Sequence, residues 1–201
     1  DVYKRQGLEH SLIKKKQLDE YNSAFDDFIE RGVIREISQE ELDSWEGDCN
    51  YISHHGVIKP GSITTKLRVV SNSSLDNNGS GVSLNSILPK GPNSLSSLFE
   101  SLTSWRGNKH VVCWDIAKAY HTIKTGKQEM HFRRLVWRYG DLERNFKIYG
   151  FLVLTFGDKP AACALEVGKE LVADQAHLVL KEAAQGGEDP ANCDERMELQ
   201  H

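Results

Sequence analysis

An acidic side chain directly follows a short apolar run in the sequence VVCWDIAKAYHTI, which occupies residues 111–123. The run predicts a strand over 111–114, so that Asp115 would emerge where the strand ends. Mg²⁺ prefers one or two carboxylates together with phosphate oxygens, so an acid in this place is typical of nucleotide chemistry. The alternative is that Asp115 only caps a helix beginning at Ile116. Tyr120 is then either a core aromatic residue on that helix or a ring beside a bound sugar.

Two further positions are suited to contacts with phosphate or with a nucleotide. Arg68 lies in the strand-like segment TKLRVVSN, where a guanidinium group could clamp a triphosphate, although an arginine in a strand usually points to solvent. Phe156 and Gly157 precede a long helical pattern. A glycine in that place either ends a strand or lets a nucleotide or template base approach the backbone closely.

Other common chemical motifs do not occur in the sequence. His54 and His55 follow Cys49 by five and six residues, but a zinc knuckle needs further closely spaced cysteines. We therefore interpret both histidines as structural. The sequence holds neither G-x-x-x-x-G-K-[ST] nor G-x-G-x-x-G, which excludes the two common glycine-rich phosphate loops.

Helical and strand patterns are mixed along the chain and predict an α+β fold. Helical spacing of apolar residues predicts helices over 17–31, 94–105 and 160–182. β-Branched and apolar runs predict strands over 51–60, 63–70, 111–114, 131–138 and 146–155. Ser38 and Glu41 form a capping box that predicts the start of a further helix.

The two ends of the chain lack a pattern that connects to the rest. We expect residues 1–6, DVYKRQ, to be a translated cloning or library remnant. Residues 183–201 have little apolar pattern, and we expect them to fray.

The composition is typical of a globular protein, with 201 residues of which 39% are hydrophobic and 27% are charged. No apolar run approaches the roughly 18–20 residues that a membrane span needs. The four cysteines are widely spaced and form no C-x-x-C pair. Because Cys113 and Cys163 lie among apolar or small residues, we expect buried, reduced thiols in an intracellular, cytoplasmic protein.

The charge is distributed unevenly along the chain, whose net charge is −4. Residues 51–150 carry 14 basic and 6 acidic side chains, hence +8, whereas 1–50 and 151–201 each carry −6. A basic middle with interleaved aromatic residues is typical of a surface that follows phosphates. The alternative is a solvated face rich in lysine and arginine, and charge alone favours that alternative.

Four segments, in their order along the chain, together resemble the reverse transcriptase domain of BEL/Pao-class LTR retrotransposon Pol polyproteins. They are YISHHGVIKPGSITTKLRVVSNSS, GVSLNSILPKGPNSLSSLF, WDIAKAYHTIKTGKQEMHFRRLVWR and LTFGDKPAACALEV. The third contains the family's first catalytic motif, D-I-x-x-[AM]-[YF], and the fourth its T-[FY]-G-D-[RK]-P-A block. The likeness covers about residues 7–182. It implies the fingers and partial palm of a right-hand polymerase, with the thumb absent.

The resemblance implies a division of the chain into fingers and palm, and it implies binding partners. Fingers would be about 7–84 and 124–154, and palm about 85–123 and 155–182. The partners would be an RNA/DNA template-primer, a dNTP and the rest of the Pol polyprotein, which carries RNase H and integrase, with no membrane.

The resemblance also assigns roles around the first catalytic motif. Asp115 and the backbone carbonyl of Ile116 would bind the catalytic Mg²⁺ (or Mn²⁺) ions. Tyr120 would crowd a ribose 2′-OH and so select deoxynucleotides. The chemistry would be attack of a primer 3′-OH on the α-phosphate of a dNTP, with two metal ions stabilising the attacking and leaving oxygens.

Three more residues take their roles from the same resemblance. Arg68 would hold the incoming triphosphate from the fingers. Phe156 and Gly157 would lie beside the sugar and the templating base.

The sequence departs from the family in two places. Ser71 and Asn72 stand where the family has the last two residues of V-F-D, so a carboxylate of the finger strand is missing. No Y-x-D-D follows the long helix. The tail EDPANCDERMELQH instead carries Asp194 and Glu195 without an apolar strand around them. It has the character of a divergence, frame change or truncation. Because one carboxylate would hold two Mg²⁺ ions poorly, we expect little or no polymerase activity from this chain.

Three hypotheses follow from these observations. The first is a fragment of a retrotransposon RNA-directed DNA polymerase. The second is a polymerase relic that binds nucleic acid without chemistry. The third is an RNase H-like nuclease, which also places an aspartate on its first strand but needs further converging acids. The middle segment offers few candidates for them: Asp76, Glu100, Glu129, Asp141 and Glu143.

Overall fold

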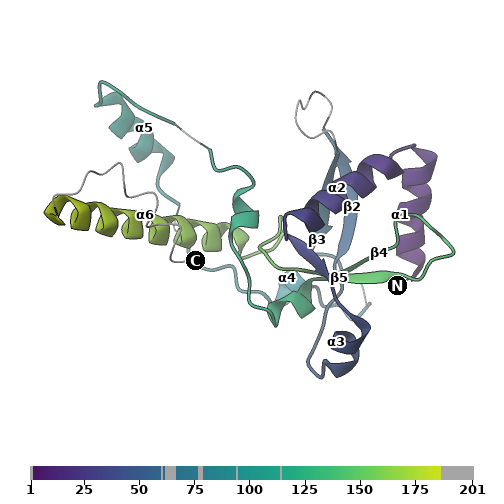
Figure 1. Ribbon diagram of the computed structural model, residues 1–201. Coiled ribbons are helices and arrows are strands. Elements are labelled where there is room, and N and C mark those ends of the chain that lie inside the picture. The colour runs from purple at the N-terminus through teal and green to yellow at the C-terminus, as the bar shows by residue number, and fades with distance from the viewer. Residues whose placement is uncertain are drawn as a thin grey trace. The chain divides into compact units, whose positions relative to one another are not determined.

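The chain is described by a computed structural model that covers residues 2–59, 61, 67–76, 79–93, 95–113 and 115–186. It divides into two compact units. Unit 1 comprises residues 1–91 and 113–161, and unit 2 comprises residues 92–112 and 162–201. The predicted α+β class is confirmed, because helices and small antiparallel sheets occur together (Figure 1).

Unit 1 holds most of the regular elements. Its helices are α1 (Val2–Lys14), α2 (Leu18–Glu30), α3 (Gln39–Ser44), α4 (Leu84–Ile87) and the 3₁₀ helices η1 (Ala119–Thr122) and η2 (Glu129–Arg133). Its strands are β1 (Ile34–Glu36), β2 (Ser53–Ile58), β3 (Leu67–Asn72), β4 (Arg134–Trp137) and β5 (Lys147–Phe151). Helix α5 (Leu98–Arg106) lies in unit 2, and α6 (Ala161–Gly186) starts at the last residue of unit 1 and continues into unit 2.

The strands of unit 1 form two antiparallel sheets. One has the order β1-β5-β4, in which Ile34 lies opposite Phe151 and Arg134 lies opposite Gly150. The other is the hairpin of β2 and β3. Helix α2 contacts both β1 and β3, and therefore joins the two sheets.

An aromatic core fills the space between α2 and the sheets. Its centre consists of fully or almost fully buried residues from α2, β4 and β5: Tyr21, Phe25, Trp137, Tyr149 and Phe151. The rings of Phe25 and Tyr149 meet edge to face at a centroid distance of 5.0 Å. The helical spacing predicted over 17–31 is confirmed, since it places these α2 side chains on the face that packs against the sheet.

His54 on β2 has a structural role, as the sequence predicts. Its Nε2 lies 3.0 Å from the carbonyl oxygen of Val136, and its Nδ1 lies 2.5 Å from the hydroxyl oxygen of Tyr21. A carbonyl oxygen only accepts, so Nε2 carries the proton and Nδ1 accepts from the tyrosine. The histidine thereby ties β2 to α2 and β4.

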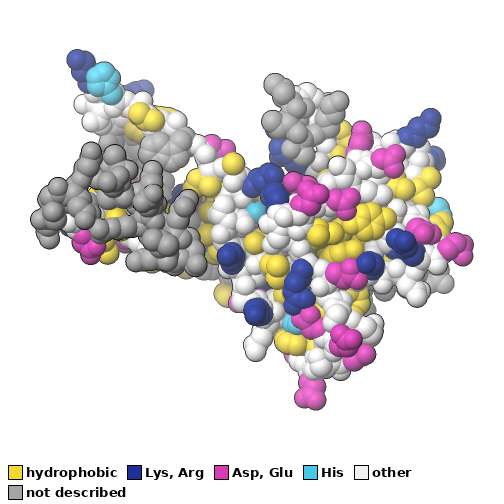
Figure 2. Space-filling model, in the orientation of Figure 1, with side chains coloured by type: hydrophobic (Ala, Val, Ile, Leu, Met, Phe, Trp, Pro, Cys, Tyr) yellow, Lys and Arg dark blue, Asp and Glu magenta, His cyan; other side chains and the backbone are white. Residues whose placement is uncertain are grey.

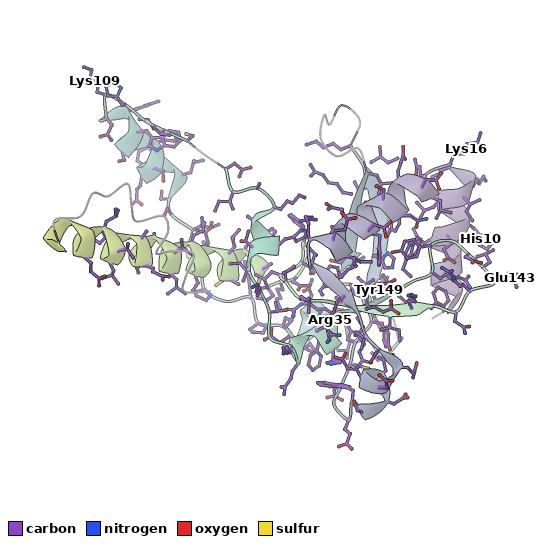
Figure 3. The ribbon with its side chains drawn as sticks, in the orientation of Figure 1. His10, Lys16, Arg35, Lys109, Glu143 and Tyr149 are labelled. Carbon is purple, nitrogen blue, oxygen red and sulfur yellow. The ribbon has the colours of Figure 1, made fainter. Side chains whose placement is uncertain are left out.

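A serine cap and an ion pair hold the start of helix α3. Ser38 caps α3 by accepting a hydrogen bond from the backbone N–H of Glu41, as predicted. The Glu41 carboxylate binds the guanidinium of Arg35 instead of closing the capping box, with N–O distances of 2.6 and 2.8 Å. Arg35 lies on β1, beside the sheet centre that Tyr149 occupies (Figure 3).

A buried ion pair fastens α1 to the end of β4. The Arg138 guanidinium lies 2.9 Å from the Glu9 carboxylate, whose side chain is fully buried. In Figure 3, His10 is labelled on α1 and Glu143 in the loop between β4 and β5. Helix α1 begins at Val2, so residues 2–6 continue a helix with the residues that follow. The origin of residues 1–6 as a remnant stays a prediction.

Several predicted boundaries are corrected. The segment 111–113 forms no strand and Cys113 is exposed, so the predicted strand end and buried thiol are both wrong there. The segment 131–138 begins in the 3₁₀ helix η2 and only its second half is strand. Helix α5 begins after Ser97, which caps it. Cys163, on α6, is half-buried.

One further predicted element is confirmed, and several predicted segments lie outside the described residues. The long helix predicted over 160–182 is confirmed as α6. The first part of the strand predicted over 63–70, Trp114, and the tail from residue 187 on lie outside the described residues. Among the described residues, none of the helices combines the length and apolar character needed to cross a membrane.

Candidate functional site

The turn that precedes α6 has a backbone shape that only glycine adopts easily. Gly157 has φ +102°, in the left-handed range that side chains with a Cβ avoid. A Cβ built at this position would lie 3.1 Å from the carbonyl oxygen of Ser71 on β3. The backbone at Gly157 therefore lies close to the protein's own strand β3, while the approach of a nucleotide or template base to this glycine stays a prediction.

Side chains from two other elements hold the polar backbone groups of this turn. The Ser71 hydroxyl donates to the carbonyl oxygen of Phe156 at 2.9 Å. The Asn85 amide, from α4, donates to the carbonyl oxygen of Gly157 at 2.7 Å and accepts from the backbone N–H of Lys159 at 2.8 Å. Three backbone groups of the turn are thus satisfied by residues about 70–85 positions earlier, which fixes its shape.

A buried ion pair lies directly under the turn. The Asp158 side chain is 0% exposed, and its carboxylate accepts from the Arg133 Nε at 2.7 Å. Its other oxygen accepts from the Ser73 hydroxyl at 2.5 Å. Because a buried carboxylate without partners is strongly unfavourable, this arrangement ties the turn to both η2 and the end of β3.

The four sequence segments that carry the family resemblance meet at this point. Ser73 comes from the first segment, Asn85 from the second, Arg133 from the third and Asp158 from the fourth. None of these four was a predicted site residue. In the sequence, these residues are distinguished only by lying inside the four segments. That position does not predict that they contact one another.

The turn places Phe156 against Tyr120. The two rings meet edge to face with centroids 4.8 Å apart and an interplanar angle of 88°. Tyr120 is half-buried on η1, whereas Phe156 is 49% exposed. This aromatic pair therefore joins the third and fourth segments and keeps one ring accessible to solvent.

Asp115 and Ile116 precede η1 and are exposed. They belong to no regular element, so Asp115 neither ends a strand nor caps a helix starting at Ile116. The first regular turn begins only after Lys118, which has the left-handed backbone angle φ 55°. Both sequence-based interpretations of the position of Asp115 are therefore wrong, while its role stays a prediction.

Arg68 lies on the solvent side of the β2–β3 hairpin. Side chains alternate along a strand, and Leu67 and Ser71 are buried whereas Arg68 is exposed. Its side chain therefore leaves the hairpin on the face opposite Ser71, which holds the turn. In the described part of the chain, no hydrogen bond, ion pair or ring contact joins Arg68 to Tyr120, Phe156 or Gly157.

His121 lies between this aromatic pair and the end of α2. Its ring is 5.7 Å from that of Phe156 and 5.4 Å from that of Phe28. The Arg31 guanidinium lies 3.3 Å from its Nδ1. Burial, together with the positive charges of Arg31 and Lys118, lowers the pKa of His121 to about 4. The imidazole is thus neutral near pH 7 and accepts from Arg31 through Nδ1.

The residues in place do not fit a centre with two Mg²⁺ ions. Such a centre needs several carboxylates close together. Within the described ranges, no three His, Cys, Asp or Glu side chains gather where they could hold a metal ion. Asp158, the acid nearest the turn, is already bound to Arg133 and Ser73.

The predicted site is therefore assembled in part. Tyr120, Phe156 and Gly157 come together, Asp115 lies five positions before Tyr120 in the same unit, and Arg68 is not brought to them. No family model matches the chain, and no curated protein shows significant similarity to it.

Proposed function

We propose that this chain is the fingers and part of the palm of an RNA-directed DNA polymerase of the BEL/Pao retrotransposon class. In this proposal it holds template-primer and nucleotide but does not polymerise in this form. The ranges 7–84 and 124–154 for fingers, and 85–123 and 155–182 for palm, belong to the same proposal.

The observation that carries the proposal is the meeting of the four segments at the turn before α6. Ser73, Asn85, Arg133 and Asp158, one residue from each segment, are joined by hydrogen bonds. The adjacent Phe156 packs its ring against that of Tyr120, and the resemblance gives nucleotide contacts to both aromatic residues.

The lack of catalysis follows from the acids that are present. Asp115 is exposed, and the described residues gather no further carboxylates around it. With so few carboxylates gathered among the described residues, we expect these residues to hold the divalent ions of phosphoryl transfer poorly. We infer that they bind and orient nucleic acid and nucleotide.

Binding to nucleic acid should be weak and dependent on salt. On the face seen in Figure 2, the basic and acidic side chains of unit 1 are interspersed. Each neutralised phosphate adds about 0.9 to the slope of log affinity against log salt for duplex DNA. We therefore expect a shallow slope that reflects a few contacts.

The test is to measure binding and primer extension together on the full chain. A labelled RNA–DNA template-primer should bind, with affinity falling as salt rises, and no dNTP should be incorporated in the presence of Mg²⁺. Lys124→Gln with Lys127→Gln should lower the salt slope, because both lysines are exposed and follow Tyr120 by four and seven positions. The matched control, Lys14→Gln with Lys15→Gln, removes two exposed charges from the end of α1 and should leave the slope unchanged.

Three outcomes would count against the proposal. Absence of binding at low salt would remove both the polymerase and the relic hypotheses. Clear incorporation would contradict the inactivity. Metal-dependent cleavage of the hybrid, abolished by Asp115→Asn, would favour the nuclease hypothesis instead.

A further inference from the structure

Four charged or titratable side chains gather at the end of α2, next to the aromatic pair. They are Asp27, Arg31, Lys118 and His121, and we call them the Lys118 cluster. The Arg31 Nη2 lies 2.7 Å and the Lys118 Nζ lies 3.8 Å from the same oxygen of Asp27, Oδ2. Two cations thus share one carboxylate, and the cluster retains one positive charge when His121 is neutral.

The cluster still has donors and access for a ligand. A guanidinium group has five N–H donors, and Arg31 uses three of them on Asp27 and His121. The Lys118 side chain is 55% exposed, and its one ion-pair partner among the described residues, Asp27, lies at a distance too long for a strong hydrogen bond. Both cations therefore have donors available for an anion from solvent.

The backbone of Lys118 is also unusual. Its φ of 55° is rare for a residue with a long side chain, and its carbonyl oxygen accepts the first hydrogen bond of η1, from His121 at 2.8 Å. Strained backbone is found preferentially where a functional side chain must be held in one direction. At Lys118, which lies two positions before Tyr120, the side chain is directed so that its ammonium group lies beside Asp27.

We propose that Arg31 and Lys118 form an anion subsite that takes a phosphate group beside the Tyr120–Phe156 pair. The sequence assigned such a role to Arg68, which leaves its hairpin on the face opposite the turn. His121 links the subsite to the aromatic pair, since it contacts both Arg31 and Phe156. That the phosphate belongs to a nucleotide or to a nucleic-acid backbone rests on the proposed function, whereas the anion site itself does not.

An anion in the subsite would act on His121 with a definite sign. Arg31 and Lys118 lower the pKa of this imidazole, and Asp27 raises it. A bound phosphate would offset the two cations, so the pKa of His121 should rise. The histidine is therefore a built-in reporter of occupancy.

The experiment titrates the full chain with tripolyphosphate and follows the imidazole signals by ¹H–¹⁵N NMR, with His121→Gln to assign the signal. We expect a saturable shift and a raised pKa of His121. Lys118→Gln should weaken the affinity and Asp27→Asn should strengthen it, each by about two- to fivefold, the range of an exposed charge pair. Lys15→Gln removes an equal charge from an exposed position in the connection between α1 and α2 and should change nothing.

The two variants are expected to change the anion affinity in opposite directions. This distinguishes an anion site from a purely structural ion pair, which either change would weaken. No saturable shift, equal effects of Lys118→Gln and Lys15→Gln, or weaker binding in Asp27→Asn would each overturn the subsite. Titrations with dTTP and with an RNA–DNA hybrid then identify the source of the phosphate. A response to tripolyphosphate with none to dTTP or the hybrid would leave the anion site standing and overturn the proposed function.

Discussion

Replacing Asp158 by alanine should cost far more stability than breaking a surface ion pair of the same length. The pair of Asp158 with Arg133 and the pair of Glu36 with Lys147 both have N–O distances of 2.7 Å. They differ in burial, with side-chain exposures of 0% and 7% in the first pair and 49% and 48% in the second. Distance is therefore held constant while solvent screening changes.

The magnitudes follow from that difference. Removing one partner of a buried pair leaves an uncompensated charge and costs about 3–5 kcal/mol of the free energy of unfolding. Glu129 lies 4.0 Å from the Arg133 guanidinium and compensates part of that charge, so we expect the lower end of this range. Glu36→Ala should cost less than about 1 kcal/mol, because exposed pairs are screened by water.

The assay is denaturant unfolding of the full chain, followed by circular dichroism and by tryptophan fluorescence, to which Trp137 in the core of unit 1 contributes. The double variant Asp158→Leu with Arg133→Met should recover part of the loss, because neither charge then remains buried. The reasoning is refuted if Asp158→Ala and Glu36→Ala cost the same, or if the double variant is no more stable than Asp158→Ala.

Three further predictions test the turn and its surroundings. Gly157→Ala should lower the free energy of unfolding by about 1–2 kcal/mol, since its backbone angle disfavours a Cβ. Gly7→Ala, in the middle of α1 with open space around it, should instead stabilise by about 0.5–1 kcal/mol. Asn85→Ala should cost about 1–2 kcal/mol, because it removes the side-chain hydrogen bonds to Gly157 and Lys159, whereas Asn145→Ala, at an exposed position, should be nearly neutral in the same unfolding assay. The pKa of His121 lies near 4 in the native protein, below its ordinary value of 6.5, so the unfolded chain binds more protons between these pH values. Stability should therefore fall as the pH drops through that window, and His121→Gln should flatten this part of the stability–pH curve. An unchanged curve would contradict the burial and charge assigned to His121.

Local patterns in the sequence determined the elements whose stability depends on near neighbours. The spacing of apolar residues in α2 and α6 marks a helical face, and Ser38 caps α3 through an N–H three residues away. The sequence also identified His54 as structural. In each case the residue type itself carries the information, because the interaction or the backbone angle is set by chemistry near that residue.

Only the tertiary structure decided which distant residues meet. A strand needs a neighbouring strand to pair with. Residues 111–113 are apolar, but they pair with no strand within the described ranges and therefore do not form one. Arg68 is strand-like in sequence, but the pairing of β3 with β2 decides which face its side chain leaves from. Ser73, Asn85 and Arg133 gather around Asp158, although Ser73 precedes Asp158 by 85 positions in the sequence. Such contacts depend on the chain being folded back on itself, and no property of any one segment specifies them.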